Sequence, residues 1–244
     1  MRHLADANAL VVTGAALCPA TPLLHPALTG RDPVVPELRR ACARAVTRLL
    51  AAEPDTVVVI GIAAATGEWD PVARLDPSVF APGIPTAGEK SLPPSLGLGT
   101  LLLDQAGYTG RCRLQAVGRD EPVGASVRLG TLLDETGSRV ALLVMGDGSA
   151  RRTLKAPGYL DDRAAAFDAE VERAVRAGDL GVLRRLDQRL ARDLMATGWP
   201  AWQVLSGALT NQIHDAEVLY CDAPFGVGYI VAHLRPRRDL PHRV

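Results

Sequence analysis

The sequence lacks an excess of charge of either sign. Its 244 residues include 27 Lys and Arg against 27 Asp and Glu. The chain as a whole therefore has no positive field that would attract nucleic acid or an anionic membrane surface. We expect neither of these as a partner.

Long apolar runs are also missing, and none approaches the length that crosses a bilayer. The stretch NALVVTGAALCPATP has some features of a lipoprotein signal. However, Asp6 stands where such a signal is basic, and Leu17 precedes Cys18 where a small residue is needed. We interpret the stretch as a buried strand and expect a soluble, cytoplasmic protein.

Cysteines are few, and they lie far apart. Cys18, Cys42, Cys112 and Cys221 show neither the short paired spacing of a zinc site nor a dense disulfide framework. Reduced thiols in a cytoplasmic protein explain them most simply.

Hydrophobic residues, in contrast, make up 48% of the chain, enough for a substantial core. Several short apolar stretches are rich in β-branched residues and bounded by Gly, Pro or Asp, which predicts strands. Two of them, TVVVIGI and RVALLVMG, are almost continuously apolar and suit strands that are covered on both faces. The strands predicted in this way are Leu10–Leu17, Thr56–Ile62, Arg113–Val117 and Val140–Met145.

Helical periodicity is clearest between the first two of these strands, where apolar residues recur through Val34–Ala52 with Pro36 in the opening turn. This arrangement makes a βαβ start. Further helices are predicted at Leu101–Ala106, Val123–Glu135, Arg163–Ala177, Leu180–Ala196 and Ala201–Leu209.

The remaining segments complete the expected architecture. The stretch Trp69–Pro94, rich in proline and glycine, predicts a long surface loop, and the apolar stretches around Pro224 predict a hairpin at one edge of the sheet. We predict a single α/β domain over residues 1–235, with a central mostly parallel or mixed sheet flanked by helices. Residues 236–244 would form a basic, flexible tail.

Six short motifs follow one another along the chain: CPATPLLHPALTG, GDGSARR, FDAEV, GDLGVLRRLD, AWQVLSGAL and FGVGYIVA. Their order and spacing resemble the class III extradiol ring-cleavage dioxygenase superfamily, of the B-subunit type, and in particular its shorter actinobacterial branch. Together they cover nearly the whole chain. The resemblance implies an α/β fold and, for active members, ferrous iron held by two histidines and a carboxylate.

Three positions matched to the family's functional histidines hold alanine in this sequence. The resemblance places iron ligands in the turn after the first strand and after the second strand, where Ala20 and Ala65 stand. It places an acid–base histidine after Asp147-Gly148-Ser149, where the chain has Ala150. Alanine offers neither a lone pair nor a titratable proton. We therefore expect no metal, no cofactor and no ring cleavage.

A substitute metal site is an alternative. Cys18, His25, Cys221 and Asp222 flank predicted strand ends or turns, and cysteine and histidine are common zinc ligands. No ligand-type spacing supports this idea, and the competing interpretation is that His25 caps a loop while His214 lies in a helix-to-strand connection.

The loop after the strand at Val140–Met145 is the main candidate for a ligand site, because ligands of α/β folds bind at the carboxyl ends of strands. We predict a pocket around Thr21, Asp147, Ser149, Arg151 and Asp222 that binds a small anionic molecule. Arg151, Arg152 and Lys155 would supply positive charge. The alternative is a plain turn whose basic residues pair with Asp161 and Asp162.

Two functional hypotheses follow. The first is a family member without the iron site that binds a small anionic ligand or catalyses another reaction. The second is a non-catalytic assembly protein, forming a homo-oligomer or a heteromer. A serine hydrolase is disfavoured because Ser149 lacks the Gly-x-Ser-x-Gly context and an obvious histidine partner.

Overall fold

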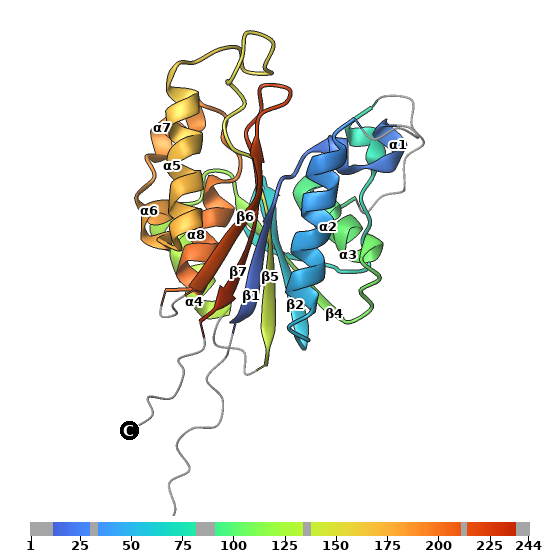
Figure 1. The fold of residues 1–244 in the computed structure, drawn as a ribbon. Coiled ribbons are helices and arrows are strands. Elements are labelled where there is room, and N and C mark those ends of the chain that lie inside the picture. Colours follow the sequence, from blue (N-terminus) through green and yellow to red (C-terminus); the bar gives the residue numbers. More distant parts are fainter. Residues whose placement is uncertain (1–11, 30–33, 82–90, 134–137, 211–213, 238–244) are drawn as a thin grey trace, which may run out of the picture.

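The computed structural model describes residues 12–29, 34–81, 91–133, 138–210 and 214–237. These residues form a seven-stranded sheet between two layers of helices (Figure 1). The strands are β1 (Val12–Cys18), β2 (Thr56–Ala63), β3 (Gly67–Trp69), β4 (Arg111–Gly118), β5 (Val140–Met145), β6 (His214–Asp222) and β7 (Tyr229–Pro236).

The strand order is β3-β4-β2-β5-β1-β7-β6. The four central strands β4, β2, β5 and β1 are parallel, while β3 and the β6–β7 hairpin pair antiparallel at the two edges. The predicted α/β class with a mostly parallel, mixed sheet is confirmed, as is a hairpin at one edge. Because the central strands are parallel, the loops that follow β1 and β5 meet at one end of the sheet.

Helices cover both faces of the sheet (Figure 1). No described helix is both long and apolar enough to span a membrane. One face carries α1 (Pro26–Thr29), α2 (Pro36–Leu50) and α3 (Pro94–Gln105); the other carries α4 (Val123–Leu133), α5 (Arg163–Ala177), α6 (Leu180–Arg185), α7 (Gln188–Asp193) and α8 (Trp199–Ala208). Two short 3₁₀ helices, η1 (Pro22–Leu24) and η2 (Pro77–Val79), lie in the loops after β1 and β3.

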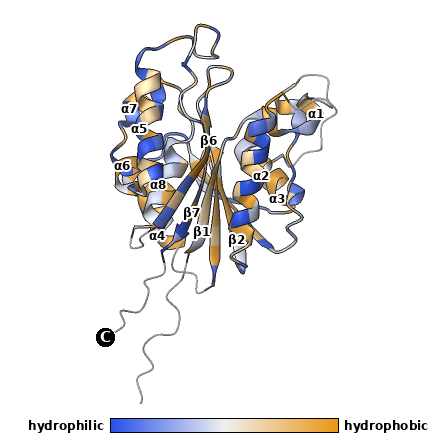
Figure 2. Cartoon of the chain, viewed as in Figure 1, coloured by the Kyte–Doolittle hydropathy of each residue, from blue (hydrophilic) through white to orange (hydrophobic). Residues whose placement is uncertain are grey.

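Successive side chains of the central strands point to opposite faces of the sheet, and this divides the interior into two apolar cores. Val58 and Ile60 of β2 pack with the α4–α8 layer, whereas Val57 and Val59 pack with the α2–α3 layer. Both faces are buried, which explains why these strands are continuously apolar in sequence. Figure 2 shows the same distribution, with apolar strands between helices whose polar residues face outward.

Several predicted elements differ from the structure. The predicted helix Leu180–Ala196 is wrong as one element: it divides into α6 and α7 because Asp187 caps the second helix, accepting hydrogen bonds from the backbone N–H groups of Arg189 and Leu190. The helix α3 begins at Pro94, seven residues before the predicted start at Leu101. The predicted connection residue His214 is instead the first residue of β6, and it is buried.

Two other predictions lie partly outside the described residues. They are the start of the first strand and residues 238–244 of the tail. Within the loop predicted from Trp69 to Pro94, the structure adds the end of β3 and the short helix η2.

Close contact between α4 and α8 leads to a first prediction. A Cβ atom on Gly130 would lie 2.0 Å from the backbone oxygen of Val204, so the two helices must separate to accommodate it. We expect Gly130→Ala to lower the free energy of unfolding by roughly 1–3 kcal/mol, a typical cost of overpacking. Gly124→Ala is the matched control, because on the same helix its Cβ would meet only the Arg128 side chain at 3.4 Å. Urea unfolding of both variants tests this; equal midpoints would contradict it.

Candidate functional site

A pocket of about 540 Å³ lies at the carboxyl ends of β1 and β5. Its walls come from the loops that follow these two strands, the connection between α7 and α8, and the β6–β7 hairpin. The lining is mostly apolar, with four polar side chains. The lining residues are Thr21, Pro22, Leu23, Val34, Asp147, Ala150, Pro157, Met195, Thr197, Phe225, Val227 and Tyr229.

Thr21 and Tyr229 form a hydroxyl pair in this pocket. Thr21 precedes η1 and accepts a hydrogen bond from the Leu23 backbone N–H, which holds the turn after β1. Its Oγ1 lies 3.0 Å from the Tyr229 hydroxyl, and both residues are almost fully buried. Because Thr21 and Tyr229 are 208 positions apart in the sequence, this contact joins the turn after β1 to the start of β7.

Asp147 is the acidic group of the pocket. It follows β5, and its Oδ1 accepts a hydrogen bond of 2.9 Å from the Ala20 backbone N–H. Burial raises the pKa of the Asp147 carboxyl from 3.8 to about 7, although the Ala20 hydrogen bond acts in the opposite direction. The carboxyl therefore exchanges its proton near neutral pH, where a general acid or base works best.

Tyr229 has the opposite property. Burial, together with the negative charge of Asp147, raises the pKa of its phenol to about 12, despite the Thr21 hydrogen bond. The phenol remains protonated across the physiological range. The pocket thus combines one group that titrates near neutrality with hydroxyls that stay neutral.

A second acidic residue, Asp168 of α5, holds the loop after β5 from beneath. Its Oδ1 accepts a hydrogen bond from the Ser149 backbone N–H at 2.8 Å, and its Oδ2 pairs with Arg152 at 3.0 Å. Cβ atoms on Gly148 and Gly228 would lie 2.7 and 2.3 Å from this carboxylate. These glycines allow the two loops to close around the Asp168 side chain.

The five residues predicted for the ligand site are only partly brought together. Thr21 and Asp147 line the pocket. Ser149 is fully buried below it, donating from Oγ to the Leu194 carbonyl oxygen. Arg151 is not among the lining residues, and Asp222 is an exposed residue at the end of β6 whose Oδ1 accepts from the Ala223 N–H.

The basic residues of this loop do not face the pocket, and no Arg, Lys or His is among its lining residues in the described part of the chain. Arg152 pairs with Asp168 rather than with the predicted Asp161 or Asp162. Asp161 pairs instead with Arg163. The backbone N–H of Arg151 donates to Ser149 Oγ.

The three alanines that the resemblance matches to histidines do not lie together in the structure. Ala150 lines the pocket and Ala20 contacts Asp147 through its backbone. Ala65 is an exposed residue of the bend after β2 and does not line the pocket.

The substitute metal site is not formed. Among the described residues, which include Cys18, His25, Cys221 and Asp222, no three His, Cys, Asp or Glu side chains lie close enough to hold a metal ion. Cys18 is buried beside Cys42, whereas Cys221 is exposed. His25 accepts a hydrogen bond from the Ala27 N–H, in agreement with its predicted role in the loop. At the three matched positions, alanine side chains offer no ligand to the ferrous iron that the resemblance implies.

Three lining residues of the pocket are not evident from the sequence pattern. Nothing in the sequence distinguishes Tyr229, Met195 or Phe225 from ordinary packing residues. The apolar stretches around Pro224 correctly predict the hairpin of β6 and β7. Nothing in the local sequence shows that this hairpin lies beside the loops after β1 and β5. The antiparallel pairing of β7 with β1 supplies that information.

Comparisons with known proteins support the fold class alone. No family model matches the chain, and no curated protein matches it. Among solved structures, the fold is similar to that of the uncharacterised protein JW3007 from Escherichia coli K12. The two superimpose with a TM-score of 0.53 at 14% identity, over 91% of this chain and 99% of that one.

Proposed function

We propose that this protein is an extradiol dioxygenase-like α/β protein without the family's iron site, whose pocket binds a small, largely apolar molecule. The family assignment rests on the six sequence motifs. In this proposal, Asp147 exchanges a proton with a polar group of the bound molecule, and the protein acts in the cytoplasm. The observation that carries the proposal is the position of the Asp147 carboxyl in an apolar pocket at the carboxyl ends of β1 and β5, where burial raises its pKa to about 7.

The side chains that line the pocket favour an uncharged ligand. An anion would meet the Asp147 carboxylate with no facing cation among the described lining residues, and buried charges need a partner. A neutral molecule with one hydrogen-bonding group avoids this penalty. Its polar group would face Asp147 and the Tyr229 hydroxyl, while its apolar body would contact Leu23, Val34 and Phe225. We therefore replace the expected anionic ligand with a neutral one for this pocket.

A thermal-shift screen with small metabolites sorted by charge tests this proposal, because a ligand that binds only the folded state raises the melting temperature. We expect neutral, partly apolar compounds to stabilise the protein at pH 7. Asp147→Asn should lower their affinity roughly tenfold, because an amide cannot form the stronger hydrogen bond of an ionised carboxylate. Asp222→Asn is the matched control, since it removes the same charge outside the pocket.

Two outcomes contradict the proposal. In the first, only anions stabilise the protein. In the second, Asp147→Asn and the control variant respond alike to every compound.

An assembly role is the second candidate, and it has a specific observation in its favour. Val34, Met195 and Phe225 are 51%, 43% and 50% exposed around the pocket. Exposed apolar groups that cluster in this way are typical of contact surfaces. In this candidate, Phe225→Ser converts a homo-oligomer to a monomer in light scattering. A wild-type protein that is monomeric at high concentration contradicts the homo-oligomer.

A further inference from the structure

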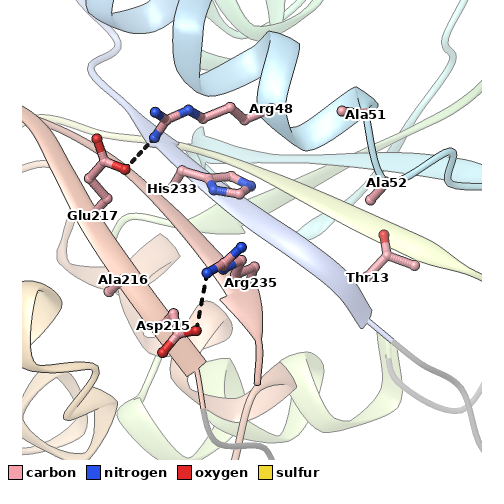
Figure 3. Close-up of a pocket in the computed structure, with 9 residues that line it drawn as sticks. All are labelled: Thr13, Arg48, Ala51, Ala52, Asp215, Ala216, Glu217, His233 and Arg235. Atoms are coloured by element: carbon pink, nitrogen blue, oxygen red, sulfur yellow. Dashed lines mark hydrogen bonds and ion pairs between the residues drawn. The ribbon is translucent and has the colours of Figure 1, made fainter. Parts of the chain in front are cut away.

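A second hollow lies at the other end of the sheet, near the start of β1 (Figure 3). It has a volume of about 700 Å³ and lies between the end of α2, β1 and the β6–β7 hairpin. An adjoining cavity of about 580 Å³ shares Thr13, Ala52, Asp215 and Arg235 with it. We call the two together the amino-end groove.

Positive charge exceeds negative charge in the amino-end groove. Its described lining contains two carboxylates, Asp215 and Glu217. Asp215 pairs with two arginines at once, at 2.8 Å from Arg237 and 3.4 Å from Arg235. The lining arginines are Arg48, Arg139, Arg235 and Arg237.

His233 of β7 lies at the centre of this charge. Figure 3 shows its ring between Arg48, which reaches from α2 and pairs with Glu217 at 2.5 Å, and Arg235. The imidazole makes no hydrogen bond to another residue of the described chain. Burial lowers the pKa of His233, and the charges of Arg48 and Arg235 lower it further, against a smaller opposite effect of Glu217. The imidazole therefore faces guanidinium groups from two elements, α2 and β7, and both groups disfavour its charged form.

We propose that the amino-end groove binds the phosphate group of a small molecule. Two arginines in excess of the carboxylates match the charge of a phosphate monoester, which is about −1.5 to −2 at neutral pH. Guanidinium groups also match phosphate oxygens with paired hydrogen bonds. The existing ion pairs do not prevent this, because the side chains of Arg235 and Arg237 are 69% and 58% exposed. Exposed ion pairs exchange partners at little cost.

This inference is independent of the function proposed for the pocket. The groove contains residues from the amino-terminal ends of the parallel strands, such as Thr13 of β1, whereas the pocket follows their carboxyl-terminal ends. Neither set of lining residues overlaps the other. A failure of one assignment therefore leaves the other standing.

Titration with inorganic phosphate, followed by the imidazole NMR signals, tests the proposal. His233→Asn assigns the signal. We expect phosphate to shift the His233 resonance saturably at pH 7.5 and to raise the imidazole pKa, because a bound anion favours the charged ring. Acetate at the same ionic strength should produce no saturable shift.

Arginine variants locate the site. Arg235→Ala and Arg48→Ala should each weaken phosphate binding at least fivefold. Arg128→Ala removes an exposed cation from α4, on the opposite layer, and should leave the affinity unchanged. The proposal is overturned if phosphate causes no saturable shift, if acetate is equally effective, or if Arg128→Ala weakens binding as much as Arg235→Ala. Circular dichroism confirms that each variant is folded.

Discussion

Asp147→Asn is expected to make the protein more stable than the wild type above pH 7, while the two proteins have similar stability near pH 4. In the folded protein, the Asp147 carboxyl has a pKa of about 7, against 3.8 ordinarily. The folded state therefore binds more protons than the unfolded state between these values, and wild-type stability falls as pH rises through this window. Above pH 7 the full cost of the buried charge is present.

The difference between the variants should be large. A rise of about three pKa units corresponds to about 4 kcal/mol. Because Asp147 as a residue is only half-buried by surface area, we expect a stabilisation of about 2–4 kcal/mol at pH 8.5. Asparagine keeps an oxygen that accepts from the Ala20 N–H, so the turn after β1 stays in place. Urea unfolding of both proteins between pH 4 and 8.5 measures this, and parallel stability curves would contradict it.

Asp168→Ala is expected to destabilise the protein by roughly 2–4 kcal/mol. The substitution leaves the buried Ser149 N–H without its acceptor and removes the partner of Arg152. It also leaves a space between Gly148 and Gly228, which pack on the carboxylate. Because the Arg152 side chain is 31% exposed, water can solvate part of its freed charge, which limits the loss.

Asp168→Asn separates the contribution of the hydrogen bond from that of the ion pair. The asparagine oxygen can still accept from the Ser149 N–H, while the negative charge that pairs with Arg152 is lost. We expect the asparagine variant to lose less than half as much stability as the alanine variant. Chemical denaturation supplies both values. An alanine variant as stable as the wild type would show that Asp168 does not hold the loop after β5.

Much of the fold follows from sequence patterns that report burial directly. The strand Val140–Met145 and the helix Arg163–Ala177 have the predicted bounds, because an apolar strand and an amphipathic helix carry their own signals. The three-residue strand β3 carries no such signal, since its pairing with β4 alone defines it. The segment Leu180–Ala196 divides into two helices because Asp187 caps the second one. The apolar residues keep a helical spacing across this point, so the spacing alone does not reveal the break.

The sequence predicts the candidate site less completely than it predicts the fold. Thr21 and Asp147 follow strands β1 and β5, so the topology of a parallel sheet was enough to bring them together. Arg151 was misplaced because adjacent residues give no indication of which side chain a loop turns inward. The raised pKa of Asp147 cannot be predicted from the sequence near it either. Its apolar surroundings come from residues distant along the chain, such as Tyr229.

The most direct test of the proposed function is an NMR titration of the Asp147 side-chain carboxyl carbon, assigned with the Asp147→Asn variant. We predict a midpoint of about 7 for this carboxyl. A midpoint near 4 would show that the carboxyl is well solvated, and would remove the acid–base group on which the proposed function depends.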